Sequence, residues 1–421
     1  MLRLAIASLV LVLSLTVTLH AEDWPQWRGP DRTGVSKETG LLKTWPKEGP
    51  SMAWKVKDCG GGFSSVAVAD GVIYGTGSKG GKNIAWAKKV ADGSEIWTVG
   101  YAKEGSEPNA TPVVSSGKVY VLTTGGTLAC LEATTGKAIW TKSFTEDFGG
   151  KVPGWGFSET PLIDGDNLIC APGAVKAAVV ALNKDTGKVV WQTEVKKTDG
   201  AGYASPIKAT VGGVPLYITL LGKSGGVVAV HAETGKLLWQ YTKINNGTAN
   251  IPTIITRDDL VWCSTGYGDG GSALLKMKAD SKDAVSITEV VHYKSGELQN
   301  HHGGMVLVGD YVYFGSEHNS GHPACVEFKT GEIKYKEKKG AAGGGGSAAV
   351  VAVDGMLYYR YQNGVVVLLE ASPEGAKVAA SFKEPERSGK ECWAHPVVAN
   401  GKLYLRDQDK LFCYSVKADK N

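Results

Sequence analysis

The segment Asp185 to Gln192, D-T-G-K-V-V-W-Q, constrains this chain more than any other, because closely similar segments recur along nearly the whole sequence. Each contains a glycine turn that is followed, after three residues, by an aromatic ring. The other copies lie at residues 92–97, 135–140, 234–239 and 330–335. The first four aromatic residues are about 43 to 51 positions apart, and a repeat of this length indicates one supersecondary unit used many times.

Each copy predicts a β-hairpin. The glycine supplies the positive φ that a tight turn needs, and the residues after it alternate between apolar and polar. Two more short strands joined by a second glycine turn precede each hairpin, as in residues 67–74, 113–121 and 351–359. Four short antiparallel strands per repeat are typical of a propeller blade, since the radial arrangement of such sheets leaves only short edges.

The number of repeats predicts how the ring closes. Seven complete blades are expected at residues 63–101, 109–145, 157–196, 203–243, 250–293, 301–338 and 346–383. An eighth, from Trp393 to Val416, has only three strands, whereas Met52 to Lys57 has the pattern of an outermost strand and no partner nearby. The sequence therefore predicts one all-β domain over residues 51–416, an eight-bladed β-propeller of repeats whose ring is closed by its N-terminal strand.

The two ends of the chain lie outside the repeats. Residues 1–21 carry Arg3, then an apolar run, then Ala21 at a plausible cleavage point, and so predict a secretory signal peptide, with an uncleaved membrane anchor as the alternative. Residues 22–50 form a Trp-rich extension and residues 417–421 a short tail. No later stretch approaches the roughly 18 apolar residues of a spanning helix. We therefore expect a periplasmic or secreted monomer with no membrane span in the mature chain.

Charge and cysteine content narrow the function classes. A net charge of +4 over 421 residues, with no long basic cluster, disfavours nucleic-acid binding. Most of the cysteines fall in predicted strands and are expected to be small buried residues. Cys59 and Cys392 fall near the expected ring closure, where a disulfide is one hypothesis in an oxidising compartment. The chain has no C-x-x-C or C-x-x-C-H motif, so no zinc site, thiol redox centre or attached haem is predicted.

The candidate site lies in the segments that precede the innermost strands, because these loops surround the central channel of a propeller. The candidate binding residues are Trp155, Glu159, Tyr203, Asn300, His301, Trp393 and His395. Such a funnel suits a small planar cofactor or a sugar, and Glu159 with Asn300 would offer oxygens to a calcium ion. The alternative is that these groups bond to the backbone and that the channel holds water.

Signals for metal binding and catalysis are weaker. His301 and His302 are neighbours in a predicted strand, so their side chains are expected on opposite faces and not around one ion. His318 and His322 lie in a predicted turn and are expected to be exposed. The chain has no G-x-S-x-G, H-E-x-x-H or phosphate-binding glycine motif. The sequence therefore assigns neither a metal site nor catalytic residues.

Together these residues resemble the pyrroloquinoline quinone (PQQ)-like repeat propellers, whose blades carry an A-x-D-x-x-T-G-K-x-x-W signature. Ala181 to Trp191 and Leu131 to Trp140 match it closely, and Asp23 to Ser36 and Trp393 to Pro396 look like segments of exported members. The resemblance implies two unlike kinds of protein. One is the quinoprotein alcohol and glucose dehydrogenases, which hold PQQ and calcium over the central pore. The other is the non-catalytic scaffold subunit of the outer-membrane β-barrel assembly machinery.

The chain departs from both kinds. It is much shorter than the dehydrogenases, lacks their adjacent-cysteine disulfide and offers no Asp that aligns with their catalytic base. It also lacks the lipobox cysteine of the scaffold and carries the extra Trp-rich segment. The first hypothesis is therefore a non-catalytic binding or scaffold propeller in the periplasm or cell envelope, with an envelope protein as partner. The alternatives are a PQQ-dependent oxidoreductase acting on alcohols or sugars, and a carbohydrate-binding propeller.

Overall fold

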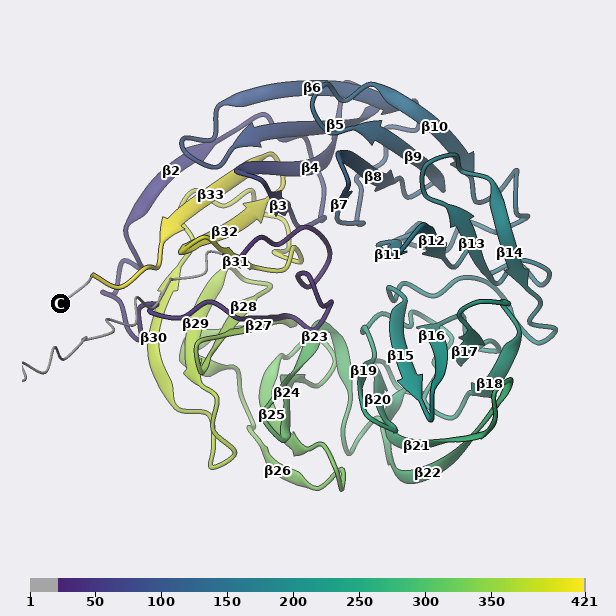
Figure 1. Ribbon diagram of the computed structural model, residues 1–421. Coiled ribbons are helices and arrows are strands. Elements are labelled where there is room, and N and C mark those ends of the chain that lie inside the picture. The colour runs from purple at the N-terminus through teal and green to yellow at the C-terminus, as the bar shows by residue number, and fades with distance from the viewer. Residues whose placement is uncertain (1–21, 420–421) are drawn as a thin grey trace, which may run out of the picture.

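The computed structural model describes residues 22–419 and confirms the predicted eight-bladed β-propeller (Figure 1). Seven four-stranded sheets and one five-stranded sheet surround a central axis. The predicted signal peptide, residues 1–21, lies outside the described residues, as do residues 420–421. Within the described part of the chain, no helix is long and apolar enough to cross a bilayer.

Within each blade, strands that follow one another in the sequence pair antiparallel. The first four blades contain β3 (Ala67–Ala69), β4 (Val72–Lys79), β5 (Lys82–Lys89) and β6 (Glu95–Ala102); β7 (Val113–Ser115), β8 (Lys118–Leu122), β9 (Thr127–Glu132) and β10 (Ala138–Ser143); β11 (Leu162–Asp164), β12 (Asn167–Cys170), β13 (Val179–Asn183) and β14 (Val189–Thr193); and β15 (Ile207–Val211), β16 (Val214–Leu220), β17 (Val227–His231) and β18 (Leu237–Tyr241).

The remaining blades follow the same order, and a 3₁₀ turn, η1 (Ala341–Gly343), precedes the seventh. They contain β19 (Ile255–Arg257), β20 (Leu260–Thr265), β21 (Gly271–Ser281) and β22 (Ala284–Lys294); β23 (Asn300–Val308), β24 (Tyr311–Ser316), β25 (His322–Glu327) and β26 (Ile333–Lys336); β27 (Ala348–Val353), β28 (Met356–Tyr361), β29 (Val365–Glu370) and β30 (Val378–Lys383), joined by β1 (Val35–Ser36); and β31 (Val397–Ala399), β32 (Lys402–Asp407) and β33 (Lys410–Ser415), joined by β2 (Met52–Val56).

Contacts between neighbouring blades explain the recurring glycine and tryptophan. The indole of Trp140 lies over Gly187 in the next blade, where an added Cβ would meet the ring at 2.9 Å. Gly187 also has a φ of 68°, so both the conformation and the close approach require glycine. Trp140 Nε1 donates a hydrogen bond to the Lys184 carbonyl at 2.9 Å. The same pair of contacts joins Trp97 to Gly136 and its blade, and Trp191 to Gly235 and its blade.

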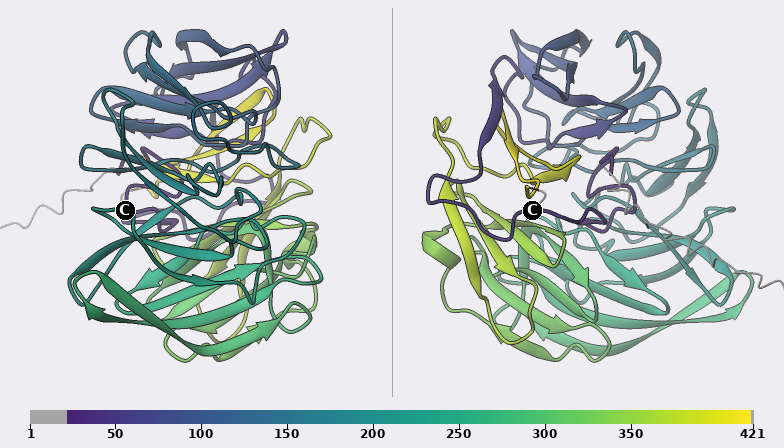
Figure 2. Two further views of the ribbon diagram at one scale, coloured as in Figure 1. Left: turned by 90° about the vertical axis from the view of Figure 1, so that its right-hand side faces the viewer. Right: turned by 60° about the vertical axis from the view of Figure 1, so that its left-hand side comes forward.

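The ring closes as the repeat pattern predicts. β2 pairs antiparallel with β33, which places Trp54 opposite Cys413. Trp54 then docks on the first blade as the other tryptophans dock on theirs: a Cβ on Gly93 would lie 2.9 Å from its ring, and its Nε1 donates to the Val90 carbonyl at 3.1 Å. The right-hand view of Figure 2 shows β2 beside the yellow C-terminal strands. The eighth blade is therefore built from both ends of the propeller.

Residues 23–36, here called the plug, cross the centre of the ring (Figure 1, purple). Trp24 exchanges two backbone hydrogen bonds with Val68 in the first blade, each 2.8 Å long. The N–H of Val114, in the second blade, donates to the Pro25 carbonyl at 2.8 Å. At the other end of the plug, β1 pairs parallel with β27 of the seventh blade. Much of the predicted N-terminal extension thus belongs to the core of the ring.

Two buried arginines join the plug to further blades. Arg28 is 3% exposed and donates to the backbone carbonyl of Met305 in β23. Arg32 is 5% exposed and donates to the carbonyls of Thr160 and Pro161, just before β11, at 2.7 and 2.9 Å. Both arginines have positive φ values, 63° and 55°, which give the plug its tight turns. One short segment therefore contacts inner strands from around most of the ring.

The hypothetical disulfide between Cys59 and Cys392 does not form: every cysteine in the chain lies within the described residues and is unpaired and buried. Cys59 packs in an apolar cluster with Trp86, whose Nε1 donates to the Cys59 carbonyl at 2.9 Å. Cys392 lies elsewhere, where its backbone N–H donates a hydrogen bond to the Gln362 carbonyl at 3.0 Å. Burial raises the pKa of each thiol to about 11, so both remain protonated and act as small packing residues.

Candidate functional site

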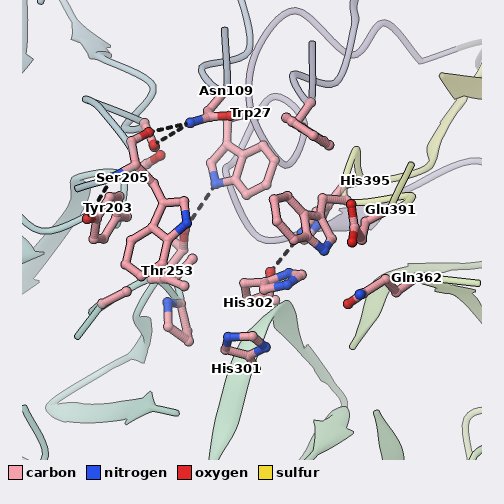
Figure 3. Close-up of a pocket in the computed structure, with 18 of the residues that line it drawn as sticks. Trp27, Asn109, Tyr203, Ser205, Thr253, His301, His302, Gln362, Glu391 and His395 are labelled. Carbon is pink, nitrogen blue, oxygen red and sulfur yellow. Dashed lines mark hydrogen bonds between the residues drawn. The ribbon is translucent and has the colours of Figure 1, made fainter. Parts of the chain in front are cut away.

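A cavity of about 530 Å³ lies at the axis of the ring, among the loops that precede the innermost strands (Figure 3). Its size falls within the range of about 300–1,000 Å³ typical of small-molecule sites. Amide, hydroxyl and imidazole side chains also line it. The aromatic residues in its lining are Trp27, Phe63, Trp155, Tyr203, Tyr267 and Trp393. The cavity thus combines apolar ring faces with dispersed polar groups.

The plug carries Trp27 into this cavity. Its Nε1 donates to the Thr253 hydroxyl at 3.0 Å, which is one of the dashed contacts in Figure 3. Its ring lies 4.4 Å from the imidazole of His395, measured between centroids. The turn that follows is held by Gly29, where an added Cβ would meet the Trp24 ring at 2.9 Å. The position of Trp27 is therefore set by contacts to Thr253 and His395 and by the tight turn at Gly29.

Aromatic pairs border the cavity on two other sides. Trp155, from the loop before β11, is 51% exposed and its ring lies 6.1 Å from that of Tyr203, from the loop before β15. The side-chain amide of Asn109 holds this loop by donating to the Trp155 carbonyl at 3.0 Å. Across the cavity, Trp393 packs against Phe63 with ring centroids 4.7 Å apart. These rings come from loops that the blades hold in place.

His301 and His302, in β23, both line the cavity, so the expectation that they point to opposite faces is wrong. Their ring centroids are only 4.4 Å apart. The pairing of β23 with β24 is interrupted between Asn300 and Met305, and Gly304 within this stretch has a φ of 71°. A bulge of this kind breaks the alternation of a regular strand, which allows both imidazoles to face the axis.

Three imidazoles in the cavity are uncharged at neutral pH. Burial lowers the pKa of His301 to about 2 and the pKa values of His302 and His395 to about 3. His301 Nδ1 shares a hydrogen bond of 2.6 Å with the Ser347 hydroxyl, whereas Nε2 of His301 and Nε2 of His302 have no partner among the described residues. Within residues 22–419, no group of three or more His, Cys, Asp or Glu is arranged to hold a metal ion.

The charged side chains that line the cavity are acidic. They are Glu107, which forms an ion pair with Lys390, and the exposed Glu391. No Lys or Arg is among the described residues of the lining. Glu391 is the charged lining residue without an ion-pair partner among the described residues, and like-charge repulsion disfavours an anionic ligand beside it.

The structure brings five of the seven candidate residues together at the cavity and leaves two outside its lining. The five are Trp155, Tyr203, His301, Trp393 and His395. Glu159 is 3% exposed and its Oε1 accepts a hydrogen bond from the Ala171 N–H at 2.7 Å. The amide of Asn300 donates to the Gly315 carbonyl at 2.8 Å. Both side chains are held within their own, different blades and lie outside the lining, so neither offers an oxygen to a ligand in the cavity.

Replacing Glu159 by glutamine is expected to weaken the pH dependence of stability. Burial raises the pKa of Glu159 from 4.5 to about 8, while the Ala171 N–H and the charge of Arg32 act in the opposite direction. A carboxyl whose pKa is higher in the folded state binds protons on folding. Its contribution to the free energy of unfolding is therefore complete below pH 4.5 and is lost as the pH rises towards 8. Urea unfolding at several pH values in this window should show a smaller fall in the free energy of unfolding with rising pH for Glu159→Gln than for the wild type. Equal slopes would contradict the assignment.

Several lining residues were not predicted from the sequence. Tyr267 follows β20 and Gln362 lies in the turn after β28, so neither occupies the kind of segment that pointed to the site. Trp27 stands in the Trp-rich extension, and that richness in tryptophan was the available signal. Its place in the cavity depends on the path of the plug, which has no repeat pattern.

A comparison with protein-family models identifies the family of this chain. The PQQ_2 family model, described as outer membrane protein assembly factor BamB, matches residues 84–337, which is more than half of the chain. The chain belongs to the PQQ_2 family. This assignment agrees with the repeats and with the docking tryptophans described above.

Curated relatives of this PQQ_2 protein are of two kinds. The quinoprotein ethanol dehydrogenase of Pseudomonas aeruginosa is 35% identical over 134 residues, which cover 31% of this chain and 20% of that protein. The outer membrane protein assembly factor BamB of Escherichia coli is 34% identical over 91 residues, which cover 21% of this chain and 22% of that protein. The PQQ_2 chain thus spans about a fifth of the length of each relative.

The fold of this PQQ_2 protein is shared with solved structures. BamB from Moraxella catarrhalis superposes with a TM-score of 0.62 at 18% sequence identity, and the match covers 88% of this chain and 99% of that one. A likeness at this level of identity shows the propeller fold and leaves the function to be argued from the site.

Proposed function

We propose that this protein is a non-catalytic binding propeller of the periplasm or cell envelope and that the central cavity is its ligand site. The observation that carries the proposal is the cavity itself, which is lined by aromatic rings and uncharged imidazoles and has acidic charged groups. Export through residues 1–21 and a scaffold role towards an envelope protein form part of the proposal. The relationship to BamB, whose name describes an outer membrane assembly factor, supports them.

A PQQ-dependent oxidoreductase is the second candidate, because one relative is named a quinoprotein dehydrogenase. PQQ is a tricarboxylic quinone and needs cationic partners. The charged residues of the cavity are instead Glu107 and Glu391, and the proposed calcium ligands Glu159 and Asn300 lie outside its lining. The residues present therefore do not fit PQQ with calcium.

Titration of the purified protein with PQQ, with and without calcium, tests the proposal. We expect no saturable quenching of tryptophan fluorescence at high micromolar PQQ, and no oxidation of alcohols or sugars with an artificial electron acceptor. Trp393→Ala is the matched control, since any quenching from the cavity should depend on this ring. Calcium-dependent quenching that this variant abolishes, together with turnover, would overturn the non-catalytic assignment.

A further inference from the structure

The cavity offers unused hydrogen-bonding groups of more than one type. The indole Nε1–H of Trp393 can only donate, the amide Oε1 of Gln362 can only accept, and Nε2 of a neutral His302 can do either. Each of these atoms is buried and lacks a partner among the described residues. A buried polar atom without a partner is costly, so a ligand that bonds to these groups gains from their preorganisation. Hydroxyl groups both donate and accept, which suits such a mixed set.

The same cavity offers flat apolar faces. Trp27 lies on the plug side, and Phe63 packs against Trp393 with an interplanar angle of 39°. His302 is also close, with its ring centroid 5.3 Å from that of Trp393. A ligand that matches this arrangement must have an apolar face for the rings and polar groups around its edge. A pyranose ring has this form, with C–H groups on its faces and hydroxyls at its edge.

Charge selects among ligands of this form. His301, His302 and His395 are neutral because burial lowers their pKa values far below 7. The acidic residues of the lining are Glu107 and Glu391, of which Glu107 is already paired with Lys390. Glu391 would therefore repel an acidic sugar, and no Lys or Arg of the described lining is present to pair with its carboxylate. A neutral sugar is not subject to this repulsion.

The plug makes the Trp27 side of the cavity rigid. Arg28, next to Trp27, donates from within the core to the Met305 carbonyl, and Trp27 is itself bonded to Thr253. These contacts reach β23 in the sixth blade and the loop before β19 in the fifth. An aromatic surface that is already in place costs little ordering on binding. The N-terminal segment thus contributes directly to the ligand site.

We propose that the cavity binds a neutral saccharide, with a sugar ring against Trp27 and its hydroxyls bonded to Trp393, Gln362 and His302. This inference rests on the proposed function, since it names the ligand class of the same site. It assigns Trp27, a residue of the plug, as a determinant of affinity, and it assigns the indole N–H of Trp393 as a donor to the ligand.

The test begins with a glycan array that carries neutral and acidic saccharides, followed by calorimetry with the neutral hits and with glucuronic acid as a charged comparison. We expect saturable binding of at least one neutral saccharide and at least tenfold weaker binding of its acidic counterpart. Failure of every neutral saccharide would overturn the saccharide assignment. If PQQ also failed to bind, the non-catalytic propeller would still stand, whereas PQQ binding with turnover would overturn the function itself.

Two matched variants test the assigned contacts. Trp393→Phe keeps an aromatic face and removes an N–H that has no partner within residues 22–419, whereas Trp27→Phe keeps a face and removes an N–H already bonded to Thr253. We expect Trp393→Phe to lower the affinity at least tenfold and Trp27→Phe to lower it less, while Trp27→Ala abolishes detectable binding. Thermal unfolding of each variant establishes that it is folded. Equal affinity in the wild type and Trp393→Phe would contradict the proposed donor.

Discussion

Glu384→Gln should lower the free energy of unfolding by about 3–5 kcal/mol, which is the typical cost of breaking a buried ion pair from one side. Arg360, in β28, donates from two nitrogens to the two carboxylate oxygens of Glu384, each at 2.7 Å, and both side chains are fully buried. A third contact at 2.7 Å reaches the Ala394 carbonyl. The pair therefore joins the interior of the seventh blade to the chain that leads into the eighth.

The physical reason for the size of this effect is the uncompensated charge. With glutamine at position 384, the Arg360 guanidinium would stay inside the protein without its counter-ion. Chemical denaturation followed by fluorescence and circular dichroism measures the loss. Replacing both residues by apolar ones, as in Arg360→Met with Glu384→Leu, is expected to recover much of it, because no buried charge remains.

A matched control uses the same substitution at an exposed pair. Glu386 pairs with Lys55, and their side chains are 45% and 44% exposed. Glu386→Gln should leave the denaturation midpoint almost unchanged, because water screens exposed pairs. If Glu384→Gln were as stable as this control, the buried pair would not be a determinant of stability.

Replacing residues 51–57 by a glycine-serine stretch of equal length should open the ring and cost at least about 3 kcal/mol, comparable to losing a large aromatic contact. The substitution removes β2, so β33 loses its edge partner and Gly93 loses the Trp54 ring that lies on it. Replacement of an ordinary segment near a terminus is tolerated far better, because such a segment makes few contacts with the rest of the fold. Thermal and urea unfolding of the variant measure the loss.

A peptide supplied in trans makes this second prediction specific. A synthetic peptide of residues 51–57 should rebind to the opened ring and raise its unfolding temperature. The same peptide with Trp54→Ala is the control and should not, because it cannot dock on Gly93 or donate to the Val90 carbonyl. Full stability of the opened ring without any peptide would contradict the role of β2 in closure.

Much of the propeller was predictable because its determinants are local and repeated. A glycine in the left-handed region and an aromatic residue four positions later are visible in one short segment that occurs five times. These copies, together with the glycine turns that join the other strands, predict the number of blades. The closing strand was predictable for the same reason, since Met52 to Lys57 carries the pattern of an outermost strand without a neighbour. The structure shows the contact behind this pattern: the tryptophan of one blade packs on the glycine of the next.

The candidate site was predictable only in part. The rule that ligands meet the loops before the innermost strands identified Trp155, Tyr203, His301, Trp393 and His395, which line the cavity. The same rule selected two residues outside the lining, because a position in a loop does not determine where the side chain points. For His301 and His302, strict strand alternation failed at the bulge before Met305. Such a bulge depends on pairing with β24 and has no signature in these two residues alone.

The amino-acid sequence by itself determined the blades, their order and the closure of the ring, because each depends on a short motif that recurs with a regular spacing. Tertiary structure alone decided the path of the plug, the pairing of Arg360 with Glu384 and the presence of Trp27 in the cavity. These features depend on single contacts between residues far apart in the chain, such as Trp27 with Thr253. Contacts of that kind have no period, so they become visible only when the folded ring brings their partners together.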